Sequence, residues 1–106
     1  HDEINFVTKA NQCTPLFLAC VQGHKQIVQY LVKSGAEINS ADNEGFTPLY
    51  VASEHGHEET VKYLVKSGAE INSCGNNGRT SLNIASQKGH EKIVEFLVKE
   101  GAKFSP

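Results

Sequence analysis

The sequence predicts an all-α solenoid, a stack of helix-turn-helix units joined by turns. Three observations support this class: short motifs recur every 33 residues, each recurrence contains two short helical patterns, and Asn, Asp and Gly gather between the recurrences. A fixed period of about 20–50 residues is typical of repeat architectures, in which neighbouring units share one continuous core. We therefore expect a linear array of three units.

The period is visible in motifs that stay in phase along the chain. The recurring motifs are Thr-Pro-Leu at 14–16 and 47–49 with Thr-Ser-Leu at 80–82, Gly-His at 23–24, 56–57 and 89–90, and Gly-Ala at 35–36, 68–69 and 101–102. Residues 30–40 are also identical to residues 63–73. This agreement places the repeats at about 9–41, 42–74 and 75–106 of a single domain, 1–106. Residues 1–8 are then the tail of a preceding repeat or an N-terminal extension.

Each repeat begins with a threonine that can cap a helix. The hydroxyls of Thr14, Thr47 and Thr80 can accept hydrogen bonds from the free N–H groups of a helix N-terminus. Pro15 and Pro48 follow at the first helical position, where the missing N–H costs nothing. The glycine of each Gly-His pair then ends this helix, because glycine readily adopts the left-handed conformation.

A second helix follows each Gly-His pair. In the first repeat Ile27, Val28, Leu31 and Val32 form an apolar stripe at helical spacing, and the other repeats keep it. Lys33 closes the helix, where positive charge suits the helix dipole. Helices of about 8–10 residues are too short to persist alone in water, so stacking of neighbours must stabilise them.

The central repeat resembles the ankyrin repeat. The residues that carry the resemblance are Gly45-Phe46-Thr47-Pro48-Leu49, Ala52, Gly56-His57, Val61, Leu64-Val65 and Gly68-Ala69-Glu70-Ile71-Asn72. Three copies in register extend it from about Lys9 to Phe104. The resemblance implies L-shaped repeats with β-hairpin tips at right angles to the helix pairs. It also implies a module for protein–protein interaction.

Several positions depart from the ankyrin pattern or have a special role in it. Phe17, Tyr50 and Asn83 stand where the family usually has a histidine that braces the hairpin. Asn39 and Asn72 match an asparagine that braces the hairpin in the family. The resemblance implies this structural role for both, with hydroxylation by a cellular asparaginyl hydroxylase as the alternative.

Composition argues against several other functions. The formal net charge of −2 offers no broad attraction to phosphate, and no apolar run approaches the ~20 residues that span a bilayer. We therefore expect neither a nucleic acid nor a membrane as partner. Cys13, Cys20 and Cys74 lack C-x-x-C spacing, which argues against a disulfide framework and a zinc site. A reducing, cytoplasmic compartment fits best, and the nucleus stays open.

The histidines do not indicate chemistry. His24, His57 and His90 recur in register, which predicts a structural role at the turn between helices. His55 and His57 form an H-x-H pair without a third ligand at zinc spacing. No nucleophile comes with a base and an orienting group. We therefore expect no enzyme, with no catalytic, metal-binding or cofactor-binding residue and no cofactor.

Recognition of a partner protein is expected at positions that the repeat leaves free. In the ankyrin family these are the hairpin tips and the inner face of the first helix. The candidate residues are Asn11, Cys13, Val21, Gln22, Asn43, Glu44, Phe46, Glu54, His55, Asn76, Asn77, Arg79, Gln87 and Lys88. The surface is acidic in the second repeat and basic in the third. A partner with basic and acidic patches in that order would be steered into register.

Phe46, flanked by Arg79, is the expected hot spot, because aromatic residues and arginine dominate binding energies. Truncation by Phe46→Ala is expected to cost about 1–3 kcal/mol of binding with little change in melting.

A structural spacer is the alternative function. The third repeat is as apolar as an internal one, with Phe96 and Val98 on its second helix. This suggests that the three repeats were cut from a longer array, although a natural terminus also fits the departures at Glu100 and Lys103. Uncapped terminal repeats would let an otherwise monomeric chain stack end to end.

The third repeat is predicted to open first. Ser81 replaces the proline of the other two repeats, and the loss of that rigidity is worth roughly 0.4–1 kcal/mol. Native-state hydrogen exchange should therefore find the amides of residues 75–106 the least protected. The prediction fails if that repeat is the best protected.

Overall fold

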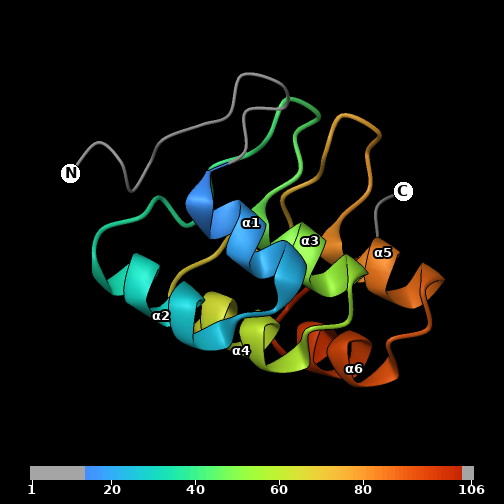
Figure 1. Ribbon diagram of the computed structural model, residues 1–106. Coiled ribbons are helices and arrows are strands. Elements are labelled where there is room, and N and C mark those ends of the chain that lie inside the picture. The colour runs from blue at the N-terminus through green and yellow to red at the C-terminus, as the bar shows by residue number, and fades with distance from the viewer. Residues whose placement is uncertain (1–13, 104–106) are drawn as a thin grey trace.

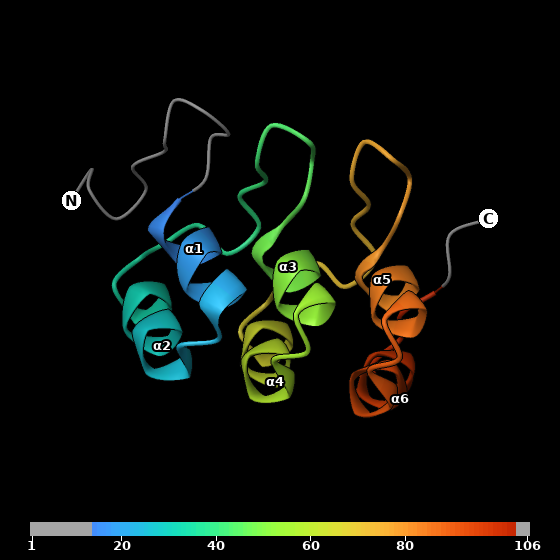
Figure 2. The ribbon, with the colours of Figure 1, turned by 45° about the vertical axis from the view of Figure 1, so that its right-hand side comes forward.

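The computed structural model describes residues 14–103, and over this range the chain forms six helices in three pairs (Figure 1). The helices are α1 (Pro15–Gln22), α2 (Lys25–Lys33), α3 (Pro48–Glu54), α4 (Glu58–Lys66), α5 (Ser81–Gln87) and α6 (Glu91–Lys99). Figure 2 shows α1, α3 and α5 in one row and α2, α4 and α6 in a second. The predicted all-α solenoid is confirmed. The expected tail at residues 1–8 lies outside the described residues.

Threonine caps begin α1, α3 and α5, which we call the inner helices, as predicted. Thr14 Oγ1 accepts a hydrogen bond from the backbone N–H of residue 17 at 3.1 Å, and Thr47 Oγ1 accepts one from residue 50 at 3.2 Å. In the third repeat Thr80 Oγ1 accepts from Asn83 N, and Asn83 Oδ1 accepts in return from Thr80 N. This reciprocal capping box supports the helix that lacks a proline.

The predicted structural role of the Gly-His pairs is confirmed for His57 and His90, and it extends across repeats. Gly23 has φ +74°, and its missing side chain makes room for the His57 ring, which an added Cβ would approach to 2.5 Å. Nε2 of His57 lies 2.9 Å from the carbonyl oxygen of Val21. His90 sits on Gly56 in the same way, with Nε2 3.0 Å from the carbonyl oxygen of Glu54. We call each such contact between consecutive repeats a seam.

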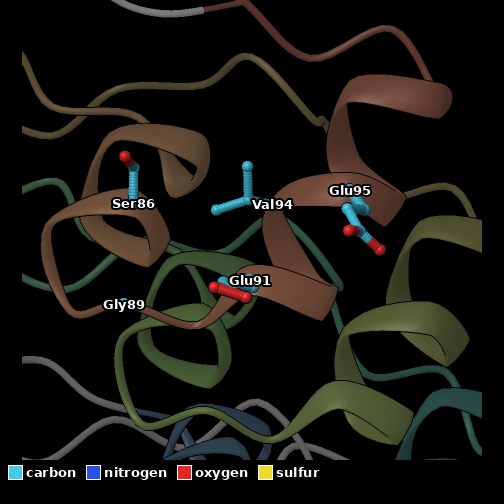
Figure 3. Close-up of a pocket in the computed structure, with 5 residues that line it drawn as sticks. All are labelled: Ser86, Gly89, Glu91, Val94 and Glu95. Atoms are coloured by element: carbon cyan, nitrogen blue, oxygen red, sulfur yellow. The ribbon is translucent and has the colours of Figure 1, made fainter.

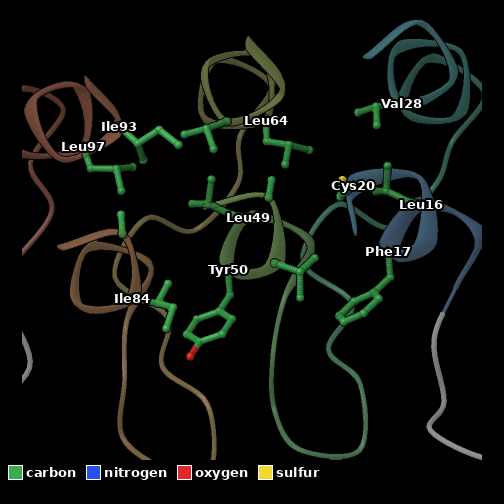
Figure 4. Close-up of a cluster of buried hydrophobic side chains, with 14 of the residues drawn as sticks. Leu16, Phe17, Cys20, Val28, Leu49, Tyr50, Leu64, Ile84, Ile93 and Leu97 are labelled. Carbon is green, nitrogen blue, oxygen red and sulfur yellow. The ribbon is translucent and has the colours of Figure 1, made fainter. Parts of the chain in front are cut away.

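The core runs between the two rows of helices without interruption (Figure 4). Its fully buried residues include Leu16, Cys20, Val28, Leu49, Ala52, Val61, Leu64, Leu82, Ala85, Ile93 and Leu97. Cys20 is therefore a small residue of the packed core. Burial raises the pKa of its thiol to about 12, because a thiolate would lose its hydration there.

The segments at residues 34–47 and 67–80 project from the same side of the helices (Figure 2). We call their outer parts, residues 41–46 and 74–79, the tips. In the first tip Asp42 N donates to Phe46 O at 2.9 Å, and in the second Gly75 N donates to Arg79 O at 3.1 Å. Within the described residues the expected β-hairpins are reduced to one bridge, Cys74–Thr80. Asn and Gly disfavour longer strands here.

The two asparagines that were expected to brace the hairpins link consecutive repeats. Asn39 Oδ1 accepts a hydrogen bond from the backbone N–H of Glu70 at 2.8 Å. Asn72 Oδ1 accepts from Lys103 N at 2.7 Å, and its Nδ2 donates to Gly101 O at 3.3 Å. Each side chain therefore satisfies main-chain groups of the following repeat.

The buried hydroxyl of Ser53 is predicted to lower the free energy of unfolding. Its hydroxyl is fully buried and has no hydrogen-bond partner, and the equivalent position in the first repeat holds Cys20. Ser53→Ala removes this unsatisfied group and improves helix propensity, so the free energy of unfolding should rise by about 1 kcal/mol. Denaturant titration measures the change. Ser86→Ala at the exposed equivalent position is the control and should gain no more than about 0.5 kcal/mol. A clear loss of stability in Ser53→Ala would contradict the argument.

Candidate functional site

Twelve of the fourteen predicted recognition residues lie in the part of the chain that the structure describes. Asn11 and Cys13 lie outside the described residues, so their prediction is untested. The others lie on the tips or at the C-terminal ends of α1, α3 and α5, and we call them the recognition face. Its exposed members are Gln22, Asn43, Glu44, His55, Asn76, Asn77, Arg79, Gln87 and Lys88, and its half-buried members are Val21, Phe46 and Glu54.

The two tips are hydrogen-bonded to each other. Asn76 N donates to Glu44 O at 2.8 Å, and Asn76 Nδ2 donates to Asn43 O at 3.3 Å. Within the tips, Asp42 Oδ1 accepts from the N–H groups of residues 44 and 46, and Asn77 Oδ1 accepts from Arg79 N. The backbone of the tips is therefore held in a defined arrangement, which leaves the side chain of Glu44 exposed.

Phe46 joins the second and third repeats. Its ring stacks on the ring of Tyr50 with centroids 4.4 Å apart and planes 6° from parallel. On its other side the ring lies against Gly75, where an added Cβ would come within 2.5 Å of a ring carbon. Phe46 is thus half-buried between two tips, and its ring contributes to packing as well as to the exposed recognition face.

Tyr50 lies at the centre of the polar groups of the face. The residue is buried, and its hydroxyl forms a hydrogen bond with the side chain of Asn77. Burial raises the pKa of Tyr50 above its usual value, the Asn77 hydrogen bond opposes that rise, and the charges of Glu54 and Arg79 act in opposite directions. The sequence prediction missed Tyr50. The available signal was its place after Thr-Pro-Leu, where the three repeats carry Phe, Tyr and Asn.

Arg79 connects the second tip to α5. Its Nη1 donates a hydrogen bond to Gln87 Oε1, so a residue of the tip is fixed to the end of an inner helix. The structure therefore brings Asn77, Glu54 and Arg79 to Tyr50, and Gln87 joins this cluster through Arg79. Val21 and Gln22 belong to the first repeat and do not take part in this cluster.

The described histidines do not form a metal site. The ring centroids of His55 and His57 are 6.1 Å apart, and His57 is engaged in a seam. Over residues 14–103 no group of three His, Cys, Asp or Glu side chains is placed to hold a metal ion. In the same range no helix is long and apolar enough to cross a membrane.

Comparison with known proteins identifies the repeats. Residues 1–75 match a model of ankyrin repeats in three copies, and residues 77–105 match a single ankyrin repeat. The chain is 47% identical over 45 residues to ankyrin repeat and KH domain-containing protein mask-1 of Caenorhabditis elegans, a match that covers 40% of the chain and 2% of that protein. It is 43% identical over 44 residues to human ankyrin repeat domain-containing protein 17, covering 42% of the chain and 2% of that protein.

A shorter match links the chain to human oxysterol-binding protein-related protein 1, with 65% identity over 26 residues. It covers 24% of the chain and 3% of that protein. The chain thus spans a few per cent of the length of the relatives it matches.

The geometry changes what Phe46→Ala is expected to do. Because the ring packs on Tyr50 and Gly75, its removal should lower the free energy of unfolding by about 1–2 kcal/mol in addition to weakening binding. Denaturant titration of the variant tests this. Asn43→Ala, an exposed change in the same tip, should alter stability by no more than about 0.5 kcal/mol. Equal stability of the two variants would mean that the ring contributes no packing.

Proposed function

The chain belongs to the ankyrin-repeat family, and on that premise we propose that it is a non-catalytic module that binds a partner protein through the recognition face. Ankyrin repeats generally mediate protein–protein interactions. We place the module in a reducing, cytoplasmic compartment, with which the exposed free thiol of Cys74 agrees. The partner is a protein, with neither nucleic acid nor membrane involved.

The observation that carries the proposal is the cluster around Tyr50. A tip residue, Arg79, is tied to the inner helix α5 through Gln87, and Phe46 stacks on the same tyrosine. One main-chain hydrogen bond and one from the Asn76 amide join the two tips and hold their backbones in place. A surface whose groups are already ordered loses little conformational entropy on binding, which favours affinity. Aromatic and arginine side chains are also the residues that most often dominate binding energies.

The charges of the recognition face suggest the chemistry of the partner. The side chains of Glu44 and Glu54 are acidic and come from the second repeat, while Arg79 and Lys88 are basic and come from the third. A partner segment with a basic group followed by an acidic group along the array would meet both patches. Such complementarity fixes register and speeds association more than it raises affinity.

We predict that reversing the basic patch strongly reduces capture of the partner. The double variant Arg79→Glu, Lys88→Glu places four additional units of negative charge on the face, all at exposed positions. Affinity capture from a lysate followed by quantitative mass spectrometry should show the partner retained by the wild-type chain and reduced at least about tenfold by the variant.

The matched control is Lys33→Glu, Lys66→Glu, which makes the same change of charge at exposed ends of α2 and α4 in the other row of helices. Capture by this control should equal that of the wild-type chain. Equal loss in both double variants would move the site away from the recognition face. If the wild-type chain retains no partner, the spacer function is favoured instead.

A further inference from the structure

The second tip contains a pair of residues that can react with each other. Asn77 is followed by Gly78, and no other asparagine of the sequence precedes a glycine. In such a pair the main-chain nitrogen of the second residue can attack the side-chain carboxamide of the first, because glycine has no side chain to hinder the approach. The other asparagines of the tips, Asn43 and Asn76, are followed by residues that have side chains. Asn77 alone meets this steric condition.

The structure leaves the Asn77 carboxamide accessible and polarised. Asn77 is exposed, and its Oδ1 accepts a hydrogen bond from Arg79 N at 3.0 Å. This bond closes a ring of side-chain and main-chain atoms that contains the Gly78 nitrogen. Attack on the carboxamide carbon places negative charge on Oδ1, and an N–H group that already points at this oxygen stabilises that charge. The geometry therefore favours the reaction at this carbon.

One hydrogen bond opposes the attack. Gly78 N donates to Gly75 O at 2.9 Å, and the nitrogen must release this bond and lose its proton before it can react. The bond closes a single turn at the end of a loop, and such a turn opens at a far lower free energy than the whole domain. The reaction therefore needs only local opening of residues 75–78, and the rest of the fold stays intact.

We propose that Asn77 is a site of spontaneous modification, at which the chain converts its own asparagine into an acidic residue. The Gly78 nitrogen forms a bond to Cγ of Asn77, the bond between Cγ and Nδ2 breaks, and ammonia leaves with the proton that the nitrogen has lost. Solvent water then opens the cyclic imide at one of its two carbonyl carbons, which gives aspartate or isoaspartate. Water is the only co-reactant, and the neutral amide becomes a carboxylate.

The first tip shows that an acidic residue fits this turn. The turn of the first tip is closed in the same way, with Gly45 N donating to Asp42 O at 3.0 Å. Glu44 occupies the position of Asn77 in it. Aspartate can therefore replace Asn77 without a change of the backbone. Isoaspartate adds a methylene group to the main chain, so it would shift Asn76 away from its hydrogen bonds with the first tip.

The new carboxylate changes the cluster around Tyr50. The hydrogen bond from Asn77 opposes the rise in the pKa of Tyr50, as a bond donated by Nδ2 to the phenolic oxygen does. A carboxylate has no hydrogen to donate, so the tyrosine hydroxyl becomes the donor. The added negative charge also lies beside Arg79 and lowers the net positive charge of the patch formed by Arg79 and Lys88. This consequence for binding rests on the proposed function, whereas the reaction itself does not.

Intact-mass measurement of the purified chain tests the reaction. After prolonged incubation at mildly alkaline pH the folded chain should gain about 1 Da, the difference between an amide NH2 and a hydroxyl group. Fragmentation of the peptide should place the gain on Asn77 and leave Asn43 and Asn76 unchanged. The variant Asn77→Gln should gain no mass in the same period, because its longer side chain would have to close a larger ring.

Two further variants test the effect of the modification on binding. Asn77→Asp imitates one of the two products and should reduce capture of the partner at least about threefold. Ser86→Asp is the control, because it adds the same charge at an exposed residue of α5 that lies outside the recognition face. Capture by this control should equal that of the wild-type chain. Ser86 lines a hollow of about 270 Å³ beside α5 and α6, together with Gly89, Glu91, Val94 and Glu95 (Figure 3).

The proposal is overturned if the folded chain keeps its mass while the urea-denatured chain gains mass at Asn77, because the turn then prevents the attack. It is also overturned if Asn43 or Asn76 reacts before Asn77. Equal capture by Asn77→Asp and Ser86→Asp would overturn the effect on binding alone. Circular dichroism melts establish that each variant is folded. The mass measurement needs no partner, so a failure of the proposed function would leave its result unaffected.

Discussion

The fold depends on the seams between repeats. The helices have seven to nine residues, a length that does not persist alone in water, so each pair needs a neighbour to cover its apolar side. Between described repeats this cover is nearly complete: Val28 and Val61 are fully buried. The hydrogen bonds of His57 and His90 to main-chain carbonyls then fix the distance and rotation between one repeat and the next. Stability in this chain is therefore a sum over neighbours.

This arrangement separates most of the recognition face from the parts that hold the fold together. The tips pair with each other through main-chain groups and an asparagine amide, which leaves the side chains of Glu44 and Lys88 exposed, whereas Arg79 is bonded to Gln87. Phe46 is the exception, because the same ring closes the gap between two tips and reaches the surface. A loss of binding on changing Phe46 would mix two causes, whereas changes at the exposed side chains of Glu44 and Lys88 report on recognition more directly.

Much of the fold could be predicted from the sequence, because each local feature depends on a few adjacent residues. Threonine caps, the glycine of each turn and the apolar stripes follow from the 33-residue period. The cluster around Tyr50 could not be predicted in this way. Asn77 reaches that residue across 27 positions of chain, and Gln87 joins the cluster only through its hydrogen bond with Arg79. For the same reason the pattern revealed that the histidines recur but not which carbonyl oxygen each one meets.

The residues at the ends of the inner helices explain how recognition and stacking can share one position. Val21, Glu54 and Gln87 are equivalent in the three repeats, yet one side chain is apolar, one is charged and one is a neutral amide. The seam uses only their main-chain carbonyl, as Val21 and Glu54 show. Any side chain offers that group, so the seam places no demand on the residue type. The side chain is left to the recognition face, where Glu54 carries charge and Gln87 holds Arg79. Variation at these positions can therefore change the partner without weakening the stack.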